Sequence, residues 1–196
     1  GANAILKTLE EPPPGAVLIL IGTSEQRQLP TIRSRCRIVR FSPLTQNEVE
    51  NILLQNGFVE SPEQATVGAV LGSGSVEEVL TWLDPTLSEF REQLLLRLAV
   101  GRIDQLEVST FVQGFAAPKT KENVEKRRNL HLALDVAEMF YRELLRFLAG
   151  HAATQTDRTL ERAVSDAARH WPQDVDAVVL CLERTIQAHS HIDANA

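Results

Sequence analysis

The chain has 196 residues, of which 43% are hydrophobic and 23% are charged, and its formal net charge is −6 at pH 7. This length is enough for one large domain or two small ones, and the composition is ordinary for a globular protein. The acidic balance argues against a surface that binds nucleic acid throughout, because phosphate contacts need Lys and Arg; a local basic patch remains possible. No apolar run reaches the roughly 18 residues that cross a bilayer, and no signal-peptide pattern opens the chain, so no membrane partner is expected.

The two cysteines, Cys36 and Cys181, lie far apart in the sequence. They offer neither the spacing of a metal site nor a disulfide framework, so we predict no metal site. A chain without a disulfide framework is expected in a reducing, cytoplasmic setting.

The first part of the chain predicts a helix followed by two short strands. The helix covers Ala2 to Glu11, and three prolines end it. Its last two residues, both glutamates, are adjacent, so a solvated helix end is favoured over a catalytic pair of carboxylates. Val17 to Ile21 and Ile38 to Phe41 are runs of large apolar residues, and such runs indicate buried strands.

Between these runs lies an arginine-rich stretch that begins at Leu29. Pro30 suits the first position of a helix, where its missing N–H group costs nothing. Three arginines follow within five residues, Arg33, Arg35 and Arg37. The guanidinium is a planar, permanently charged fork of donors, so this cluster suits phosphate oxygens. The alternative is a solvated helix end that the helix dipole stabilises.

Three motifs occur in a defined order around this stretch. The chain opens with Asn-Ala-Ile-Leu-Lys-Thr-Leu-Glu-Glu-Pro-Pro at residues 3–13, continues to Gly-Thr-Ser at 22–24, and reaches Ser-Arg-Cys at 34–36. In this order and spacing it closely resembles the AAA+ subunits of DNA polymerase clamp loaders. The resemblance covers residues 2 to about 44 and extends weakly through the rest of the chain.

The resemblance implies roles for single residues. Arg35, between Ser34 and Cys36, would be an arginine finger that completes the ATP site of a neighbouring subunit. Thr23, with Ser24 beside it, would occupy the sensor 1 position at the carboxyl end of the first strand, where open α/β sheets bind ligands. Without the resemblance, a hydroxyl that stabilises a turn is the simpler interpretation of Thr23. ATP and magnesium are expected in the neighbouring subunits, and no cofactor is expected in this chain.

The motifs of a complete nucleotide site are absent from the sequence. No Gly-x-x-x-x-Gly-Lys-Ser/Thr phosphate loop occurs, and no apolar strand ends in paired carboxylates for magnesium. The chain begins with Gly1 and enters directly into a helix, and two strands joined by one helix cannot form a stable sheet alone. We therefore expect a C-terminal fragment of a longer subunit, with residues 1–43 as the last part of an α/β AAA+ core.

Residues 44–85 predict three short helices, which resemble the lid domain of the family. Thr45 with Glu48 forms a capping box, and Ser61 and Ser75 are further helix starts. Relatives that bind ATP usually carry a sensor 2 arginine in the third helix, where this chain has Glu77. A carboxylate repels a triphosphate, at roughly 1 to 4 kcal/mol for two like charges about 4 Å apart. The chain is therefore not expected to use a nucleotide site of its own.

Residues 86–196 predict five helices: the first begins at Thr86 and Gly101 ends it, and the others lie at about 103–115, 121–149, 157–171 and 175–189. Thr86 and Glu89 are expected to cap the first. Apolar stripes predict an antiparallel bundle, and the resemblance implies that it is the collar that holds the subunits in a ring. Acidic and basic residues interleave at 119–128, which favours a solvated face over a nucleic-acid site. His189 and His191 are expected to be exposed to solvent and to form no site.

The predicted fold is mainly α, with a remnant of an α/β core of two parallel strands and two helices. The stretch before Ser34 is one residue shorter than in the ATP-hydrolysing subunits, so the chain resembles the delta-prime class, the stator of the bacterial DNA polymerase III clamp loader. The expected function is non-catalytic: the subunit helps load the sliding clamp onto primed DNA. Its expected partners are gamma/tau-type and delta-type subunits, with the clamp reached indirectly and primed DNA through the assembled complex.

Two alternatives remain open. The first is an ATP-hydrolysing gamma/tau-type subunit of the same complex, present as a fragment without its phosphate loop. The second is a helical scaffold unrelated to replication, in which the Ser-Arg-Cys motif is a coincidence. In the favoured interpretation the chain is not an enzyme by itself, and neighbouring subunits hydrolyse the ATP.

Overall fold

The computed structural model describes residues 2–22, 24–26, 28–100, 103–117, 123–151, 157–171 and 174–194. It divides into two compact units, Gly1–Ser42 and Pro43–Ala196. The mainly helical fold class that the sequence predicts is confirmed. Every helix in the described ranges is either too short or too polar to cross a membrane.

The first unit contains helix α1 (Ala2–Glu10) and the short helix α2 (Pro30–Arg33). The prediction of two strands in this unit is wrong for the described residues: the runs 17–21 and 38–41 have neither helix nor strand structure. Their side chains are accessible, and Ile21 and Phe41 are 97% and 93% exposed. A strand forms only where a neighbouring strand takes up its backbone hydrogen bonds, and the described part of this unit offers none.

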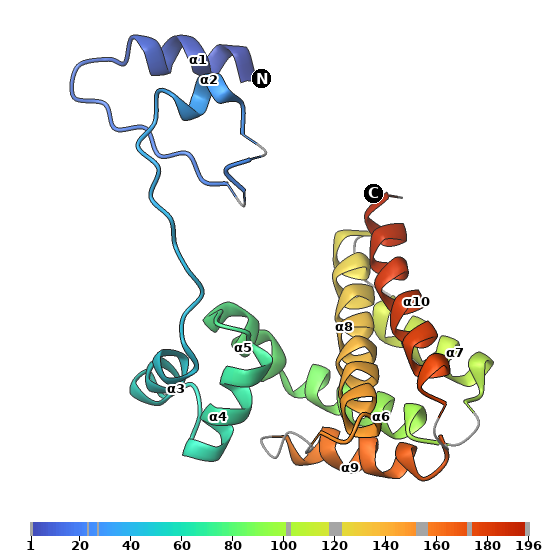
Figure 1. The fold of residues 1–196 in the computed structure, drawn as a ribbon. Helices are drawn as coiled ribbons and strands as arrows, with labels where there is room; N and C mark the ends of the chain where they lie inside the picture. The colour runs from blue at the N-terminus through green and yellow to red at the C-terminus, as the bar shows by residue number, and fades with distance from the viewer. Residues whose placement is uncertain are drawn as a thin grey trace. The chain divides into compact units, whose positions relative to one another are not determined.

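The second unit begins with three short helices that share a small core (Figure 1). These helices are α3 (Gln46–Gln55), α4 (Pro62–Leu71) and α5 (Val76–Trp82). Their apolar faces meet, and the buried residues of this core are Val49, Leu53, Val59, Ala65, Ala69 and Val79.

Each of these helices begins where the sequence predicts. The side chains of Thr45, Ser61 and Ser75 each accept a hydrogen bond from the backbone N–H group three residues further on. Glu48 completes the predicted capping box at the start of α3. Gly57 follows α3 with a φ of 68°, in the left-handed conformation that glycine adopts freely.

Five further helices form a bundle with a larger core. They are α6 (Pro85–Leu98), α7 (Gln105–Ala116), α8 (Asn123–Leu148), α9 (Arg158–Ala168) and α10 (Val175–Ala194). The expected cap of α6 is corrected: Asp84, not Thr86, is the N-cap, and its carboxylate accepts hydrogen bonds from the backbone N–H groups of Thr86 and Leu87. The reason is that Pro85 takes the first helical position, which moves the cap to the residue before it.

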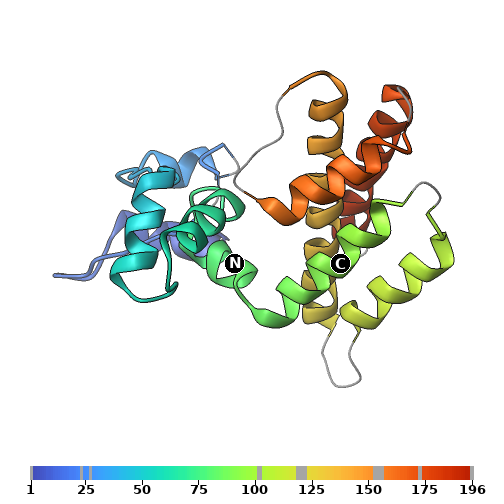
Figure 2. The ribbon, with the colours of Figure 1, turned by 90° about the horizontal axis from the view of Figure 1, so that it is seen from below.

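Helix α8 is central to the bundle, and α6, α7, α9 and α10 all pack against it. Helices α8 and α10 lie side by side and run antiparallel (Figure 1), whereas α9 lies across α8, also when seen from below (Figure 2). Val136, Phe140 and Leu144 form the apolar stripe of α8, and all three are fully buried. The core thus follows the helical spacing that the sequence predicts.

Candidate functional site

The guanidinium of Arg35 lies just beyond α2, in the turn that ends this helix. Its Nη1 donates a hydrogen bond of 2.9 Å to the carbonyl oxygen of Thr31, one turn earlier in the chain. Its Nη2 forms an ion pair of 2.6 Å with the carboxylate of Glu10 at the end of α1. The Arg35 side chain is 35% exposed. Its guanidinium is therefore bound by the protein on one side and accessible on the other.

The two neighbours of Arg35 in the motif have different environments. The hydroxyl of Ser34 donates to the carbonyl oxygen of Thr31 at 3.2 Å and lies 3.4 Å from Arg35 Nη1. Ser34 therefore belongs to the polar group that orients the guanidinium. Cys36 is a partly exposed free thiol. Nothing among its described contacts ties it to Arg35.

Arg33 and Arg40 are held by Glu25, a residue that the sequence analysis did not select. Glu25 forms ion pairs of 2.7 Å with both Arg33 and Arg40, one on each carboxylate oxygen. The hydrogen bond from Arg40, followed by the charges of Arg40 and Arg33, lowers the pKa of the Glu25 carboxyl. Arg37 is exposed and forms no hydrogen bond or ion pair within the described part of the chain. Of the arginine cluster, Arg35 and Arg33 are therefore neutralised locally and Arg37 is not.

Of the two residues predicted at the sensor 1 position, the structure describes Ser24. Thr23 lies outside the described residues. The hydroxyl of Ser24 donates a hydrogen bond of 3.0 Å to the side-chain oxygen of Gln26. This hydrogen bond is local, and among the described residues Ser24 forms none with the arginine stretch.

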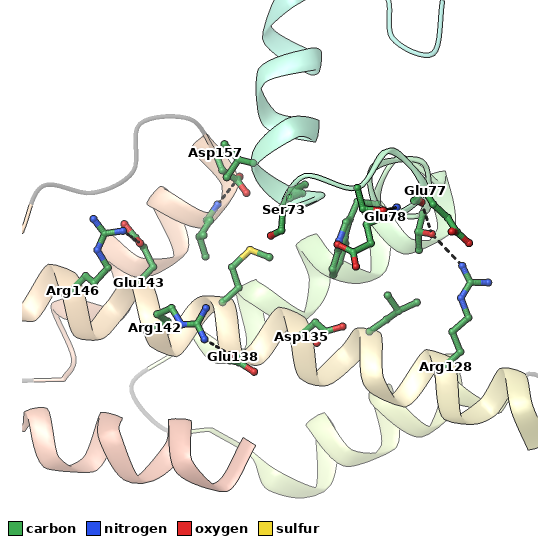
Figure 3. A pocket seen from close by; sticks show the side chains of 18 residues that line it. Ser73, Glu77, Glu78, Arg128, Asp135, Glu138, Arg142, Glu143, Arg146 and Asp157 are labelled. Atoms are coloured by element: carbon green, nitrogen blue, oxygen red, sulfur yellow. Dashed lines mark hydrogen bonds and ion pairs between the residues drawn. The ribbon is translucent and has the colours of Figure 1, made fainter. Parts of the chain in front are cut away.

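Glu77, the residue at the predicted sensor 2 position, lies in the second unit. It is exposed in the first turn of α5 and faces a groove of about 900 Å³ between α4 and α5 on one side and α8 and α9 on the other (Figure 3). Six carboxylates and three guanidiniums line this groove: Glu77, Glu78, Asp135, Glu138, Glu143, Asp157, Arg128, Arg142 and Arg146.

The arginines of the groove are engaged by the protein itself. Arg142 pairs with Glu138 and Arg146 with Glu143, while Arg128 donates a hydrogen bond of 3.2 Å to the hydroxyl of Thr81 (Figure 3). Burial raises the pKa of the Asp135 carboxyl on the same wall, against the opposing effect of nearby histidines. A polyanion would therefore meet more carboxylates than available guanidiniums in this groove.

A buried ion pair lies under the wall of this groove, and the sequence analysis missed it. Arg91 of α6 pairs with Asp157, and their side chains are 10% and 7% exposed. Asp157 also caps α9, because its Oδ1 accepts a hydrogen bond of 3.1 Å from the backbone N–H of Leu160. The sequence did contain a signal: Arg91 follows Leu87 by four residues and precedes Leu94 by three, on the apolar stripe of its helix.

The expectation that the His189 side chain is exposed to solvent is wrong. Its side chain is 21% exposed and lies against His131 of α8, with 2.9 Å between the two Nδ1 atoms. His191, by contrast, is exposed. His131 precedes His189 by 58 residues, so only the antiparallel packing of α8 and α10 brings the rings together.

Comparison with known proteins gives matches to subunits of DNA polymerase III. Residues 1–45 match the model of a family described as DNA polymerase III, delta subunit. The DNA polymerase III subunit delta' of Bacillus subtilis is 26% identical over 98% of this chain and 57% of its own length. The subunit delta' of Pseudomonas aeruginosa is 60% identical over 35 residues, which are 18% of this chain and 11% of that protein.

A subunit of a second type matches less than half of the chain. The DNA polymerase III subunit gamma/tau of Mycobacterium tuberculosis is 34% identical over 92 residues, which are 45% of this chain and 16% of that protein. This chain spans 57% of the Bacillus subtilis relative and smaller shares of the other two. No solved structure matches the chain. The similarity extends over nearly all of the chain for a delta' subunit and over less than half of it for this gamma/tau subunit.

Proposed function

We propose that this chain, a DNA polymerase III clamp-loader subunit of the delta-prime kind by sequence similarity, lends Arg35 to the ATP site of a neighbouring subunit. In this proposal the subunit hydrolyses no ATP itself. It assembles through the α6–α10 bundle with gamma/tau-type and delta-type subunits in the cytoplasm. The complex then helps place the sliding clamp on primed DNA, with the clamp and the DNA contacted through the assembly.

The geometry of Arg35 is the observation that carries the proposal. Its guanidinium is oriented by the Thr31 carbonyl oxygen, and its Nη2 binds the carboxylate of Glu10 while the group remains 35% exposed. A carboxylate oxygen and a phosphoryl oxygen are both anionic acceptors of charge-assisted hydrogen bonds. An arginine that binds a carboxylate at the surface is suited to exchange it for a phosphoryl oxygen when the phosphate of a neighbouring subunit approaches.

An arginine supplied to a neighbour stabilises charge that develops during phosphoryl transfer. Such an arginine is worth about 10³ to 10⁵ in turnover rate in well-studied phosphoryl-transfer proteins. The protein's share of the chemistry is position and charge, since the nucleotide and its magnesium belong to the other subunit.

The surroundings of Glu77 support the second half of the proposal, that this chain does not use a nucleotide of its own. Glu77 stands where ATP-binding relatives are expected to have an arginine, and Glu78 lies next to it on the same groove wall. The guanidiniums on the opposite wall are already bound to carboxylates or a hydroxyl. A triphosphate would meet six carboxylates in this groove, and two of its three guanidiniums are already paired with carboxylates.

The test is Arg35→Ala in the assembled complex, with ATP hydrolysis measured in the presence of clamp and primed DNA. Hydrolysis at the adjacent site is expected to fall by about 10³ or more, so the total rate loses that site's share. Arg37→Ala is the matched control, because Arg37 is an exposed arginine two positions away with no described partner. Unchanged hydrolysis in the Arg35→Ala complex would contradict the proposal, provided that the complex still assembles.

The gamma/tau-type alternative is kept because a gamma/tau subunit matches 45% of the chain. Calorimetric titration of the full-length protein with ATP and magnesium distinguishes the stator role from the gamma/tau-type role. No binding, together with a requirement for Arg35 in the complex, supports the stator role. Binding in the micromolar range would identify an ATP-hydrolysing type of subunit and would overturn the inference from Glu77.

A further inference from the structure

We propose that the groove lined by Glu77 binds a cationic amphipathic helix of a partner protein. The groove, of about 900 Å³, adjoins a second cavity of about 590 Å³. Glu77, Thr81, Arg128 and Leu132 line both, so the two cavities are continuous. Both lie in the second unit, and the proposal does not depend on the role of Arg35 in the first unit.

The length of the two cavities favours a helix over a small molecule as the ligand. On α8 the lining residues recur every three or four positions from Glu125 to Arg146, so the cavities follow one face of this helix. At about 1.5 Å per residue, this face is about 30 Å long. A small molecule would cover only part of it, whereas a helix of about 20 residues has the same length.

The floor of the groove carries apolar side chains. Val70 and Leu71 come from α4, and Leu132 and Met139 come from α8. Val70 is 38% exposed and the other three are half-buried, so each keeps apolar surface that a ligand can cover. Burial of such surface drives the binding of an amphipathic helix in a groove, through anchor residues three and four positions apart.

The charge of the lining determines the sign of the partner. Eight carboxylates line the two cavities, the six of the larger one together with Asp84 and Glu125 of the smaller one, and only three guanidiniums do so. Two of these guanidiniums are already paired with carboxylates of the groove. The groove therefore attracts Lys and Arg side chains and repels nucleic acid.

Three of the carboxylates have no Lys or Arg partner among the described residues: Glu77, Glu78 and Asp135. Glu77 and Glu78 project from α5, and Asp135 lies on the α8 wall (Figure 3). Acceptors on both walls, with apolar side chains between them, fit a helix that has basic residues on both sides of an apolar stripe.

The test uses the complete chain and a fluorescently labelled peptide of about 20 residues, with leucines at helical spacing on one face and lysines elsewhere. Fluorescence anisotropy is expected to show binding in the micromolar range that weakens as salt is added. One control peptide has glutamate in place of each lysine, and another has serine in place of each leucine. Both should bind at least about tenfold more weakly.

Variants of the chain locate the peptide. Glu77→Gln with Glu78→Gln should weaken binding by about threefold to tenfold, because two charges of the groove are lost. Glu89→Gln with Glu92→Gln is the matched control, since it removes the same charge from exposed positions of α6 outside both cavities, and it should leave the affinity unchanged.

Methyl NMR of the unsubstituted chain gives an independent answer. The peptide should shift the methyl signals of Leu132 and Met139, and it should not shift those of Leu180, which is exposed on α10 away from the groove. The proposal is overturned if no peptide binds, if either control peptide binds as tightly as the first, if both double variants lose affinity equally, or if only Leu180 shifts. Self-association of the chain that Glu77→Gln with Glu78→Gln abolishes would assign the groove to a second copy and would also overturn it.

Discussion

The guanidinium of Arg91 in α6 and the carboxylate of Asp157 at the start of α9 form an ion pair that the bundle core almost completely covers. The two residues are 66 positions apart in the chain. Asp157 also holds the first turn of α9 through its contact with the backbone N–H of Leu160. One carboxylate therefore pairs with a buried cation and caps a helix at the same time.

Replacing Arg91 by Met should destabilise the bundle by about 3 to 5 kcal/mol, because it leaves the Asp157 charge buried without a partner. Urea unfolding followed by circular dichroism measures this loss. The double variant Arg91→Met with Asp157→Ser keeps a capping side chain and removes both charges, so it should recover part of the stability. A loss below about 1 kcal/mol in Arg91→Met would show that water reaches the pair.

The ion pairs of Glu25 predict a pH dependence of the first unit. The pKa of Glu25 is lowered in the folded state, mainly by the hydrogen bond from Arg40. A lowered carboxyl pKa contributes stability above the ordinary value of 4.5, and that contribution is lost as the pH falls below 4.5 through the folded-state pKa. Carboxyl NMR should place the Glu25 titration midpoint below 4.5. Arg40→Gln should move the midpoint upward, and Arg37→Gln should not.

The contact between Glu10 and Arg35 predicts the effect of freeing the guanidinium. If Arg35 acts on a neighbour's ATP, Glu10 competes with the phosphate, and Glu10→Gln should raise the apparent ATP affinity of the complex. A partly exposed ion pair is worth at most about 1 kcal/mol, so the change should not exceed about fivefold. The Michaelis constant for ATP hydrolysis measures it. A loss of activity in Glu10→Gln would instead indicate that Glu10 positions Arg35.

The presence of two apolar cores predicts unequal unfolding within the second unit. Leu53→Ala removes a fully buried side chain of the α3–α5 core, and Phe140→Ala removes one from the bundle core. Each should cost about 2 to 5 kcal/mol of local stability. Hydrogen exchange should accelerate first in α3 and α4 for Leu53→Ala and first in α8 for Phe140→Ala. Equal acceleration of all helices in both variants would mean that residues 44–85 and 86–196 are one cooperative unit rather than two domains.

The sequence alone was sufficient to locate the helices. Capping side chains such as Thr45 and Ser75, and apolar residues at helical spacing, act within a few positions of each other, so their effect does not depend on the rest of the fold. The same locality explains one error of detail, the cap of α6: two capping signals lie two residues apart there, and the proline between them decides for Asp84. The strands were wrongly predicted for the opposite reason, since a strand depends on a neighbouring segment.

The tertiary structure alone decided which side chains meet. Arg35 contacts Glu10 from 25 positions away, His131 contacts His189 from 58, and Arg91 contacts Asp157 from 66. In the sequence Glu10 and Arg35 had the pattern of solvated helix ends, and His189 had that of a residue exposed to solvent. No local rule connects positions so far apart, because their approach follows from how whole helices pack. For this protein the sequence therefore determined the elements and the motif, and the packing of those elements determined the partner of each charged group.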